Sequence, residues 1–318
     1  MSGDLTARRV LVVGSANVDF TVAAPRLPAV GETVSGGTLL VNHGGKGANQ
    51  AVAARRLGAD VRFVGCVGDD GSGREIRAAL AAEGIGVAGV AITGEAATGT
   101  ALIVVDGEGR NQIAVAPGAN WRLSLEQVRS RADDFAWAEV LVCQLETPPD
   151  TIVWALEEAR RRRIVTVLNP APVREGLGDV WRFVDYLTPN EREAERLTGI
   201  AVRDLRSAAA AGHALRRRGV GTVIVTLGAQ GALACTAQGE IPAPARAVAV
   251  VDTTAAGDAF NGALAVALGA GDRVEDALRF ANAAAALACT RRGAQPSLPT
   301  RAEVDRLLGA TERNDVSD

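Results

Sequence analysis

Short apolar runs alternate with longer segments rich in alanine, leucine and charged residues along most of this sequence, and that alternation limits the folds it can adopt. The apolar runs are RVLVVG (9–14), VRFVGCVG (61–68), EVLVCQL (139–145), RIVTVLNP (163–170), VDYLTPN (184–190) and GTVIVTLG (221–228). Continuous apolar runs of this length are typical of strands buried on both faces of a sheet. The repeated order of strand, helix and strand predicts an α/β fold, with a doubly wound, mainly parallel sheet flanked by helices.

Helix-like stretches lie between these runs, and their ends carry recognisable signals. The stretches are residues 49–58, 73–84, 150–163 and 206–219. Several stop at a glycine, which is common at helix C-termini. Ser124 and Gln127 form the pattern of a capping box, which predicts a helix over residues 124–135.

Two inserts interrupt this rhythm, at about residues 17–42 and 98–116. Both contain β-rich or alternating pieces with glycine and no helical period, and the first also carries several prolines. We expect them to pair into a small β-sheet that projects as a lid from a single domain spanning residues 1–318. Because the exposed edges of such a sheet need partners, the lid could cover a site or form a dimer interface.

The composition excludes several classes of protein. The 318 residues carry 34 Lys and Arg against 37 Asp and Glu, and only 3% of residues are aromatic. A nucleic-acid-binding surface needs a basic face and rings that stack on bases, so we expect no nucleic-acid partner. No stretch is apolar for the roughly 18 residues of a membrane span, and the N-terminal apolar run is too short for a signal peptide. We therefore expect a cytoplasmic protein with no membrane partner.

The cysteines and histidines do not indicate a zinc site or a disulfide framework. The four cysteines are far apart in the sequence and form no C-x-x-C pair, which is typical of small buried side chains in a reducing compartment. The chain has only two histidines, His43 and His213.

Polar residues follow most of the predicted strands. In a doubly wound sheet, ligands bind at the carboxyl ends of the strands. The residues at these positions are Asn17, Asp19, Glu146, Asn169, Asn190, Glu193, Thr226 and Gly228. Each alone is explained by a helix cap or a turn, but their recurrence at strand ends predicts a ligand site there.

The stretch GGKGANQ (44–50) combines glycines with a cation and an amide. The glycines let the backbone approach a ligand closely, whereas Lys46 supplies charge and Asn49 can hydrogen-bond hydroxyl groups. The stretch does not have the spacing of a P-loop, and GSANVD near the N-terminus does not match the dinucleotide fingerprint G-x-G-x-x-G. A Rossmann dehydrogenase is therefore disfavoured.

The stretch VDTTAAGDAFNGAL (251–264) places small residues and Asp258 where a valine-rich segment gives way to a helix-like one. The backbone N–H groups of Ala255, Ala256 and Gly257 would be free to bind negative charge at a helix start. Asp258 could take a proton from a hydroxyl that attacks phosphorus. Asp252 lies too far away for the same role, and capping or cation binding fits it better.

These pieces together resemble the ribokinase-like (PfkB) carbohydrate kinase superfamily over nearly the whole chain. The matching segments are GSANVDF, PAVGETVSG, GGKGANQAVAARRLGA, GDDGSG, TGTALIVVDGEG, PGAN, QLETP, NPAP, TPNEREAERLTGI, VTLGAQGAL, VDTTAAGDAFNGAL and TRRGAQPS. Two of them correspond to signature regions of the family, in the family's order and spacing.

The resemblance implies ATP-dependent phosphorylation of the 5-hydroxyl of D-ribose, with Asp258 as the base. Ala255, Ala256 and Gly257 would form its anion hole. The implied sugar contacts are Asn17, Asp19, Gly45, Lys46, Asn49 and Glu146. The implied ATP-side residues are Asn190, Thr226, Gly228, Gly231 and Asn282, with Glu193 acting on Mg²⁺ through water.

The resemblance also implies an activating monovalent cation, usually K⁺, and a lid that often dimerises, so we expect a homodimer. The implied cation ligands are Asp252, Thr254, Ala288, Gly293 and Ser297. A cation there would neutralise Asp252 and shape the anion hole without touching substrate.

Some alternatives stay open on the sequence. A related kinase of deoxyribose, another pentose or a nucleoside would share these motifs. A non-catalytic sugar-binding or regulatory protein on the same fold is a weaker alternative, because Asp258, the glycine turn and the N-x-x-E motif are all retained. His43, beside the sugar loop, either touches substrate or packs within the lid.

Overall fold

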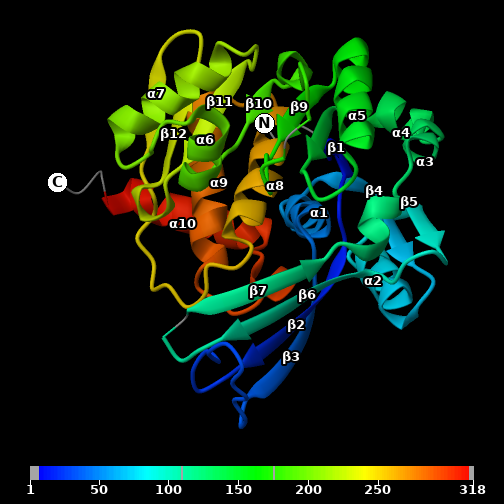
Figure 1. The fold of residues 1–318 in the computed structure, drawn as a ribbon. Coiled ribbons are helices and arrows are strands. Elements are labelled where there is room, and N and C mark those ends of the chain that lie inside the picture. Colours follow the sequence, from blue (N-terminus) through cyan, green and yellow to red (C-terminus); the bar gives the residue numbers. More distant parts are fainter. Residues whose placement is uncertain (1–6, 109, 175, 315–318) are drawn as a thin grey trace.

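The computed structural model describes residues 7–108, 110–174 and 176–314, and within them two β-sheets organise the chain (Figure 1). The larger sheet has nine strands in the order β13-β12-β11-β10-β9-β8-β1-β4-β5. Its strands are β1 (Arg9–Val13), β4 (Asp60–Gly68), β5 (Gly86–Thr93), β8 (Val140–Cys143), β9 (Val165–Leu168), β10 (Tyr186–Leu187), β11 (Thr222–Thr226), β12 (Ala232–Cys235) and β13 (Glu240–Ala243). All neighbours are parallel except at β12, which is antiparallel to both β11 and β13.

Helices cover both faces of this sheet, and a separate hydrophobic core lies under each layer. One layer contains α1 (Lys46–Arg56), α2 (Gly71–Ala82), α8 (Ala256–Gly269), α9 (Val274–Ala288) and α10 (Arg301–Asn314). The other contains α3 (Leu125–Arg129), α4 (Ala132–Trp137), α5 (Pro149–Arg162), α6 (Glu191–Thr198) and α7 (Leu205–Arg216). Short 3-10 turns are η1 (Gly118–Arg122), η2 (Val180–Phe183), η3 (Gly228–Gln230) and η4 (Gln295–Ser297). The predicted doubly wound, mainly parallel sheet is therefore confirmed.

Strand β1 illustrates why its run is continuously apolar. Val10 and Val12 belong to the core under α1 and α8, whereas Leu11 and Val13 belong to the core under α5. Successive side chains of a strand point to opposite faces, so a strand covered on both sides needs apolar residues at every position.

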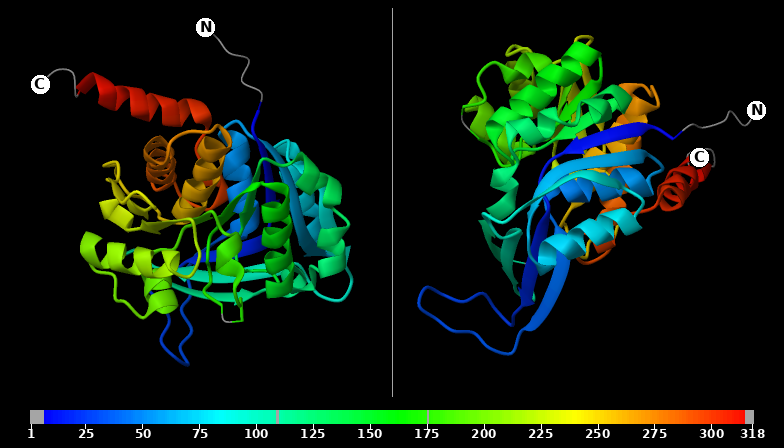
Figure 2. Two further views of the ribbon diagram at one scale, coloured as in Figure 1. Left: turned by 90° about the horizontal axis from the view of Figure 1, so that it is seen from above. Right: turned by 90° about the vertical axis from the view of Figure 1, so that its right-hand side faces the viewer.

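The second sheet is built from the two inserts, as the sequence predicts. Its strands, in the order β3-β2-β6-β7, are β2 (Asn17–Ala23), β3 (Thr38–Gly44), β6 (Gly99–Val105) and β7 (Asn111–Ala116). This lid sheet lies below the ends of α1 and α8 in Figure 1. The connection between β2 and β3 extends away from the rest of the chain in both views of Figure 2.

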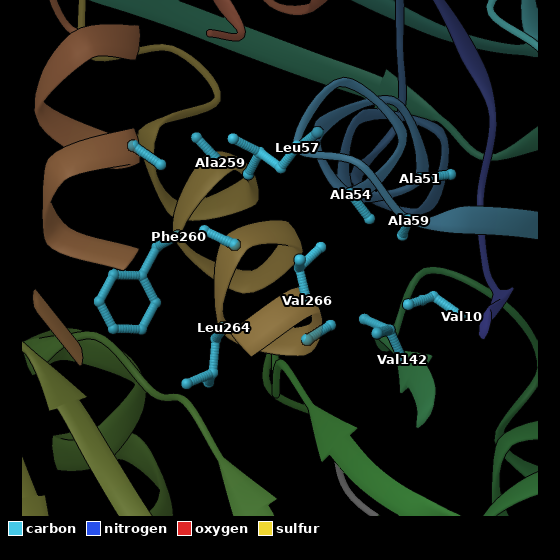
Figure 3. Close-up of a cluster of buried hydrophobic side chains, with 14 of the residues drawn as sticks. Val10, Ala51, Ala54, Leu57, Ala59, Val142, Ala259, Phe260, Leu264 and Val266 are labelled. Atoms are coloured by element: carbon cyan, nitrogen blue, oxygen red, sulfur yellow. The ribbon is translucent and has the colours of Figure 1, made fainter. Parts of the chain in front are cut away.

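Helices α1 and α8 lie side by side through small residues (Figure 3). Ala51 and Ala54 of α1 lie in the same buried cluster as Ala259 of α8. A Cβ atom at Gly262 would lie 2.5 Å from the Cβ of Ala53, so only glycine permits this separation. The close packing brings the first turns of the two helices together, and both first turns carry predicted site residues.

Two predicted elements differ from the structure. The segment 124–135 begins with the predicted capping box of Ser124 and Gln127, but its helix ends at Arg129 and a second begins at Ala132. The hydroxyl of Ser130 donates to the carbonyl of Gln127 at 2.7 Å, a local bond that competes with helix continuation. The run 184–190 contains only the two-residue strand β10, since Pro189 has no N–H for the ladder.

No helix in the parts of the chain that the structure describes is long and apolar enough to cross a bilayer.

Candidate active site

Five neighbouring strands of the large sheet end at the same edge, next to the first turns of α1 and α8. They are β1, β8, β9, β10 and β11, which are adjacent in the strand order and mutually parallel. Glu146, just after β8, accepts hydrogen bonds from the hydroxyl of Ser15 and, at 3.1 Å, from the backbone N–H of Lys46. The structure thus joins the segments after β1 and β8 to the start of α1.

A pocket of about 210 Å³ lies at this edge, between the large sheet and the lid. It is lined by Asn17, Lys46, Val115, Pro117, Asn120, Glu146, Pro172 and Arg174. Three of these residues, Asn17, Lys46 and Glu146, were predicted sugar contacts. Val115 of β7 also lines it.

Asn120 and Arg174 line the pocket, although sequence reasoning did not select them. The side-chain oxygen of Asn120 accepts from the N–H of Ala16 at 2.9 Å, and its amide donates to Asn17 at 2.7 Å. The guanidinium of Arg174 lies 4.7 Å from the ring centroid of Trp121. Asn120 lies in η1 and in the matching segment PGAN, whereas Arg174 follows NPAP by two residues and lies outside every matching segment.

Gly45 holds the start of α1 against the start of β2. Its φ of 87° lies in the left-handed region, and a Cβ there would lie 2.8 Å from Ala16 Cα and Asn17 N. A residue with a side chain would push Lys46, the first residue of α1, away from the pocket. The glycine therefore sets the position of the predicted sugar loop.

Asp258 is buried in the first turn of α8 and is held by two amides. Its Oδ2 accepts from Asn49 Nδ2 and its Oδ1 from Gln50 Nε2, both at 2.9 Å. Burial raises the pKa of Asp258 above its ordinary value, and Lys46 and the two amides oppose that rise. Asp258 does not cap α8, because the N-cap is Ala255.

At the N-terminus of α8 the expected anion hole is only partly free, because the N–H of Ala256 donates to the carbonyl of Thr253 at 3.3 Å. Ala255 has φ 59°, a left-handed conformation that costs a residue with a Cβ about 1–2 kcal/mol. Gly257 is exposed and faces open space. The first-turn N–H groups therefore adjoin Asp258 at an accessible helix end.

Two cations, Lys46 and Arg174, share this region with four acids. Burial lowers the pKa of Lys46, but Asp258, Glu146 and Glu193 outweigh it, so the pKa lies above its ordinary value. Burial, followed by Glu146 and Asp258, raises the pKa of Asp19 from 3.8 to about 6. Burial also raises the pKa of Glu193, against the opposing effects of its bond to Asn190 and of Lys46. The excess of negative charge suits a ligand that brings hydroxyl donors or a cation.

The raised pKa of Asp19 predicts a cost in stability. Below pH 3.8 the folded and unfolded forms are both protonated, so Asp19 costs nothing; the cost grows up to pH about 6 and is constant above it. Because Asp19 is only half-buried, we discount the full shift and expect Asp19→Asn to raise the free energy of unfolding by about 1 kcal/mol at neutral pH. Urea unfolding at neutral pH and near pH 4 measures this, and an equal gain at both would contradict it.

The predicted ATP-side residues divide into two groups. Asn190 and Glu193 form a capping box at the start of α6, with bonds of 2.8 and 2.9 Å. Asn190 also forms an isolated bridge with Thr226, which Gly228 follows at η3. These four residues therefore lie together beyond the ends of β10 and β11.

Gly231 and Asn282 meet elsewhere, at the segment after β13. A Cβ at Gly231 would lie 2.1 Å from the carbonyl oxygen of Ala243, and the Asn282 amide donates to that oxygen at 2.8 Å. Asn282 is buried on α9 and also donates to Pro244 at 3.3 Å. It shapes this segment rather than presenting a free amide.

The predicted cation residues come together only in part. Asp252 accepts from the N–H and hydroxyl of Thr254 at 2.9 and 2.7 Å, and from the N–H of Gly293 at 2.9 Å. Burial raises the pKa of Asp252, but these bonds outweigh it and hold the pKa below its ordinary value. Ala288 ends α9 and Ser297 lies in η4, and in the described residues neither is hydrogen-bonded to Asp252.

The donors at both candidate cation positions are hard oxygens. The carboxylate of Glu193 accepts one backbone bond at Oε2, and a carboxylate that acts through water is how Mg²⁺ is commonly held. Within the described residues, no group of three or more His, Cys, Asp or Glu side chains is placed to hold a metal ion. The arrangement thus fits a cation shared with phosphate groups or backbone carbonyls, not an all-protein metal cage.

His43 lies on the face of the lid opposite to Asp19. In the lid register His43 pairs with Val18, whereas Asp19 pairs with Asn42, and successive residues of a strand point to opposite faces. Packing within the lid, rather than contact with substrate, is the alternative that this placement favours.

The site thus combines a buried carboxylate at the start of α8 with a nearby pocket. Comparison with known proteins identifies the family. The model of the pfkB family carbohydrate kinases matches residues 7–301. The chain therefore belongs to the PfkB family of carbohydrate kinases.

Within that family the chain is similar to ribokinases. It is 40% identical over 301 residues to the ribokinase of Haemophilus influenzae, covering 95% of this chain and 98% of that protein. The structure of Arabidopsis thaliana ribokinase complexed with ribose and ATP matches with a TM-score of 0.87 at 33% identity, over 95% of this chain and 99% of that one. A deoxyribokinase of Salmonella typhi is 35% identical over 304 residues, covering 95% of this chain and 99% of that protein.

Proposed function

We propose that this chain transfers the γ-phosphoryl group of ATP to the 5-hydroxyl of D-ribose, giving D-ribose 5-phosphate and ADP. The observation that carries the proposal is the buried carboxylate of Asp258, held by Asn49 and Gln50 at the N-terminus of α8. The sugar pocket supplies Asn17, Lys46 and Glu146 beside it. The similarity to ribokinases favours ribose among the possible sugars.

Asp258 is the base in this mechanism. As the 5-hydroxyl oxygen bonds to the γ-phosphorus, its proton passes to a carboxylate oxygen of Asp258, and the bond from phosphorus to the β,γ-bridging oxygen breaks to release ADP. The raised pKa of Asp258 brings its basicity closer to that needed near neutral pH. The N–H groups of Ala255, Ala256 and Gly257 stabilise the charge on the transferred group.

The sugar is held from the lid and from α1. Asp19, Asn17 and Asn49 accept from or donate to its hydroxyls, and Gly45 lets the chain approach closely. Lys46 and Glu146 supply opposite charges at the pocket wall.

The nucleotide lies over the ends of β10 and β11, towards α9. Its phosphates face Asn190, Thr226 and Gly228, and its base faces the segment shaped by Gly231 and Asn282. Glu193 would hold a magnesium ion through water, and the ion would neutralise charge on the phosphates.

A monovalent cation would bind beside Asp252. The carboxylate, the hydroxyl of Thr254 and the carbonyls of Ala288, Gly293 and Ser297 are the donors we propose. Because Asp252 precedes the turn that carries the anion hole, an ion there would order the turn from outside the substrate site.

A panel of acceptors tests the proposal. D-ribose, 2-deoxy-D-ribose, other pentoses and adenosine are assayed for ADP formation, each in sodium and in potassium. We expect the highest kcat/KM with D-ribose and a higher rate in potassium. No turnover of ribose in potassium, together with turnover of another sugar or of a nucleoside, would refute ribose as the substrate.

The same panel separates the alternatives. A higher kcat/KM for deoxyribose would favour the second candidate, which the similarity to a deoxyribokinase supports. Sugar binding by calorimetry without any ADP formation would indicate the non-catalytic alternative.

We also propose that the chain forms a homodimer through the outer face of its lid. In the lid register Phe20 pairs with Val41 on one side and Leu102 on the other, so these residues share the face opposite to Asp19. The side chains of Leu39, Val41 and Leu102 are all more than half exposed. Contiguous apolar side chains on a sheet face are typical of an interaction surface.

Leu102→Glu is expected to convert this dimer to a monomer, because a carboxylate would be buried in the interface. Sedimentation velocity measures the change. Ile92→Glu is the matched control, since Ile92 is equally exposed but lies on β5 of the large sheet. A wild-type monomer, or a dimer that survives Leu102→Glu, would contradict the proposed interface.

A further inference from the structure

A network of buried side-chain amides joins Asp258 to the residues that follow β8 and β9. Gln50 donates to Asp258 at 2.9 Å and to the side-chain oxygen of Asn169 at 3.3 Å. Its own oxygen accepts from Gln144 Nε2 at 2.7 Å. Gln50 and Gln144 are completely buried. Burying polar side chains costs free energy unless they are hydrogen-bonded, so the presence of this network calls for an explanation.

The orientation of the side-chain amides in this network follows from one backbone carbonyl. The carbonyl of Thr188 can only accept, so the NH₂ group of Asn169, 3.2 Å away, must face it. The oxygen of Asn169 then faces Gln50. That fixes the NH₂ group of Gln50 toward Asn169 and Asp258, and leaves its oxygen for Gln144.

The amide network also connects to the backbone of α8. The hydroxyl of Thr188 donates to Asn261 at 2.7 Å, and the amide of Asn261 donates to the carbonyl of Gly257 at 2.8 Å. The residue before Asp258 and the carboxylate of Asp258 are therefore tied to the same strand ends. A rotation of the carboxylate or of the first turn of α8 would break bonds in this network.

Gln50 is distinct from Asn49, the other amide on Asp258. Neither amide is among the residues that line the pocket, but the two N–H groups of Gln50 are used by Asp258 and Asn169. It therefore has no donor left for a substrate, whereas Asn49 has a buried side-chain oxygen without a hydrogen-bond partner in the described residues.

We infer that Gln50 is a positioning residue that fixes the orientation of the Asp258 carboxylate by donating to Oδ1, so that Oδ2, which also accepts from Asn49, is directed toward the substrate proton. The inference rests on the proposed role of Asp258 as the base. A donor on Oδ1 favours the ionised carboxylate, which is the form that can accept a proton.

The effect of losing Gln50 on the pH dependence of kcat depends on the charged groups around Asp258. They are Lys46 on α1, Glu146 after β8, Glu193 on α6 and Asp19 on β2. Burial raises the pKa of Asp258, while Lys46, Asn49 and Gln50 lower it. Removing Gln50 removes one of these opposing interactions, so the pKa of Asp258 should rise further.

Gln50→Met tests the inference, because methionine is similar in size and has no N–H. With the pentose that the wild type phosphorylates, we expect kcat to fall about 30-fold, as for loss of a hydrogen bond to a charged group. KM for the sugar should change less than about twofold, since Gln50 has no donor for substrate. The acidic limb of the kcat profile should move up by about one pH unit.

Two further variants separate positioning from general destabilisation. Asn169→Leu removes the acceptor that orients Gln50 without touching Asp258, and should shift kcat and the acidic limb in the same direction by less. Thr166→Val is the matched control: it removes buried bonds of the same strand β9, to Phe183 and Asp185, and should leave kcat and the pH profile unchanged.

A double-mutant cycle gives the strictest outcome. In an Asp258→Asn background, Gln50→Met should lower the residual rate no further, because there is no carboxylate left to orient. An unshifted acidic limb, or an additive loss in the double variant, would overturn the inference. A wild type that phosphorylates no pentose would instead overturn the proposed function, so the two failures are distinguishable.

Discussion

Asp258→Asn is expected to lower kcat by about 10³-fold while KM for the sugar changes less than threefold, because general-base catalysis is worth about 10²–10⁴ in rate. Asparagine keeps the size of the side chain but cannot accept the hydroxyl proton. The carboxylate is the acceptor of two amide bonds in the structure, and the variant amide can accept at one oxygen only. Steady-state kinetics with saturating ATP measures the change.

Asp204→Asn is a suitable control for this prediction. Asp204 also lies at a helix start, but it is the exposed N-cap of α7 and accepts from Ser207. Asparagine is an equally good cap, so stability and turnover should be unchanged. An Asp258→Asn variant that keeps more than a tenth of the wild-type kcat would show that Asp258 is not the base.

The large sheet could be predicted where burial dominates. Strands such as β1, β4 and β11 are covered on both faces, so their continuous apolar runs indicated buried strands. Strands β5 and β13 lie at the two edges of the sheet. Edge strands are partly exposed and carry glycine, proline and polar residues, so periodicity did not reveal them.

The candidate site could be predicted where topology alone fixes position. Residues that follow parallel strands share one edge, which is how Asn17 and Glu146 both come to line the pocket. Asn120 reaches the pocket from the short turn η1 and Arg174 from a loop, and no rule of periodicity places such residues. The sequence does not single out Gln50, because an amide inside a helix has no characteristic motif. Its contact with Asp258 depends on the close packing of α1 against α8.

Gly44→Ala is expected to lower kcat/KM for the sugar about 100-fold by displacing Asp19. A Cβ at Gly44 would lie 2.0 Å from Asp19 Oδ2 and 2.5 Å from its Cγ, so the carboxylate has to swing away from its present position. Loss of a charge-assisted hydrogen bond to a substrate hydroxyl costs about 1.5–3 kcal/mol, which corresponds to about 10- to 150-fold. Initial rates at low sugar concentration measure the loss.

Comparison with Asp19→Ala shows whether that displacement is the cause. Once the carboxylate is absent, the alanine Cβ has room, so the double variant Gly44→Ala/Asp19→Ala should resemble Asp19→Ala alone. Gly107→Ala is the matched control, because Gly107 also lies in the lid and a Cβ there would meet nothing within 4 Å. It should leave kcat/KM unchanged. Additive losses from Gly44→Ala and Asp19→Ala would mean that the glycine acts on the lid backbone and that Asp19 holds the sugar independently of it.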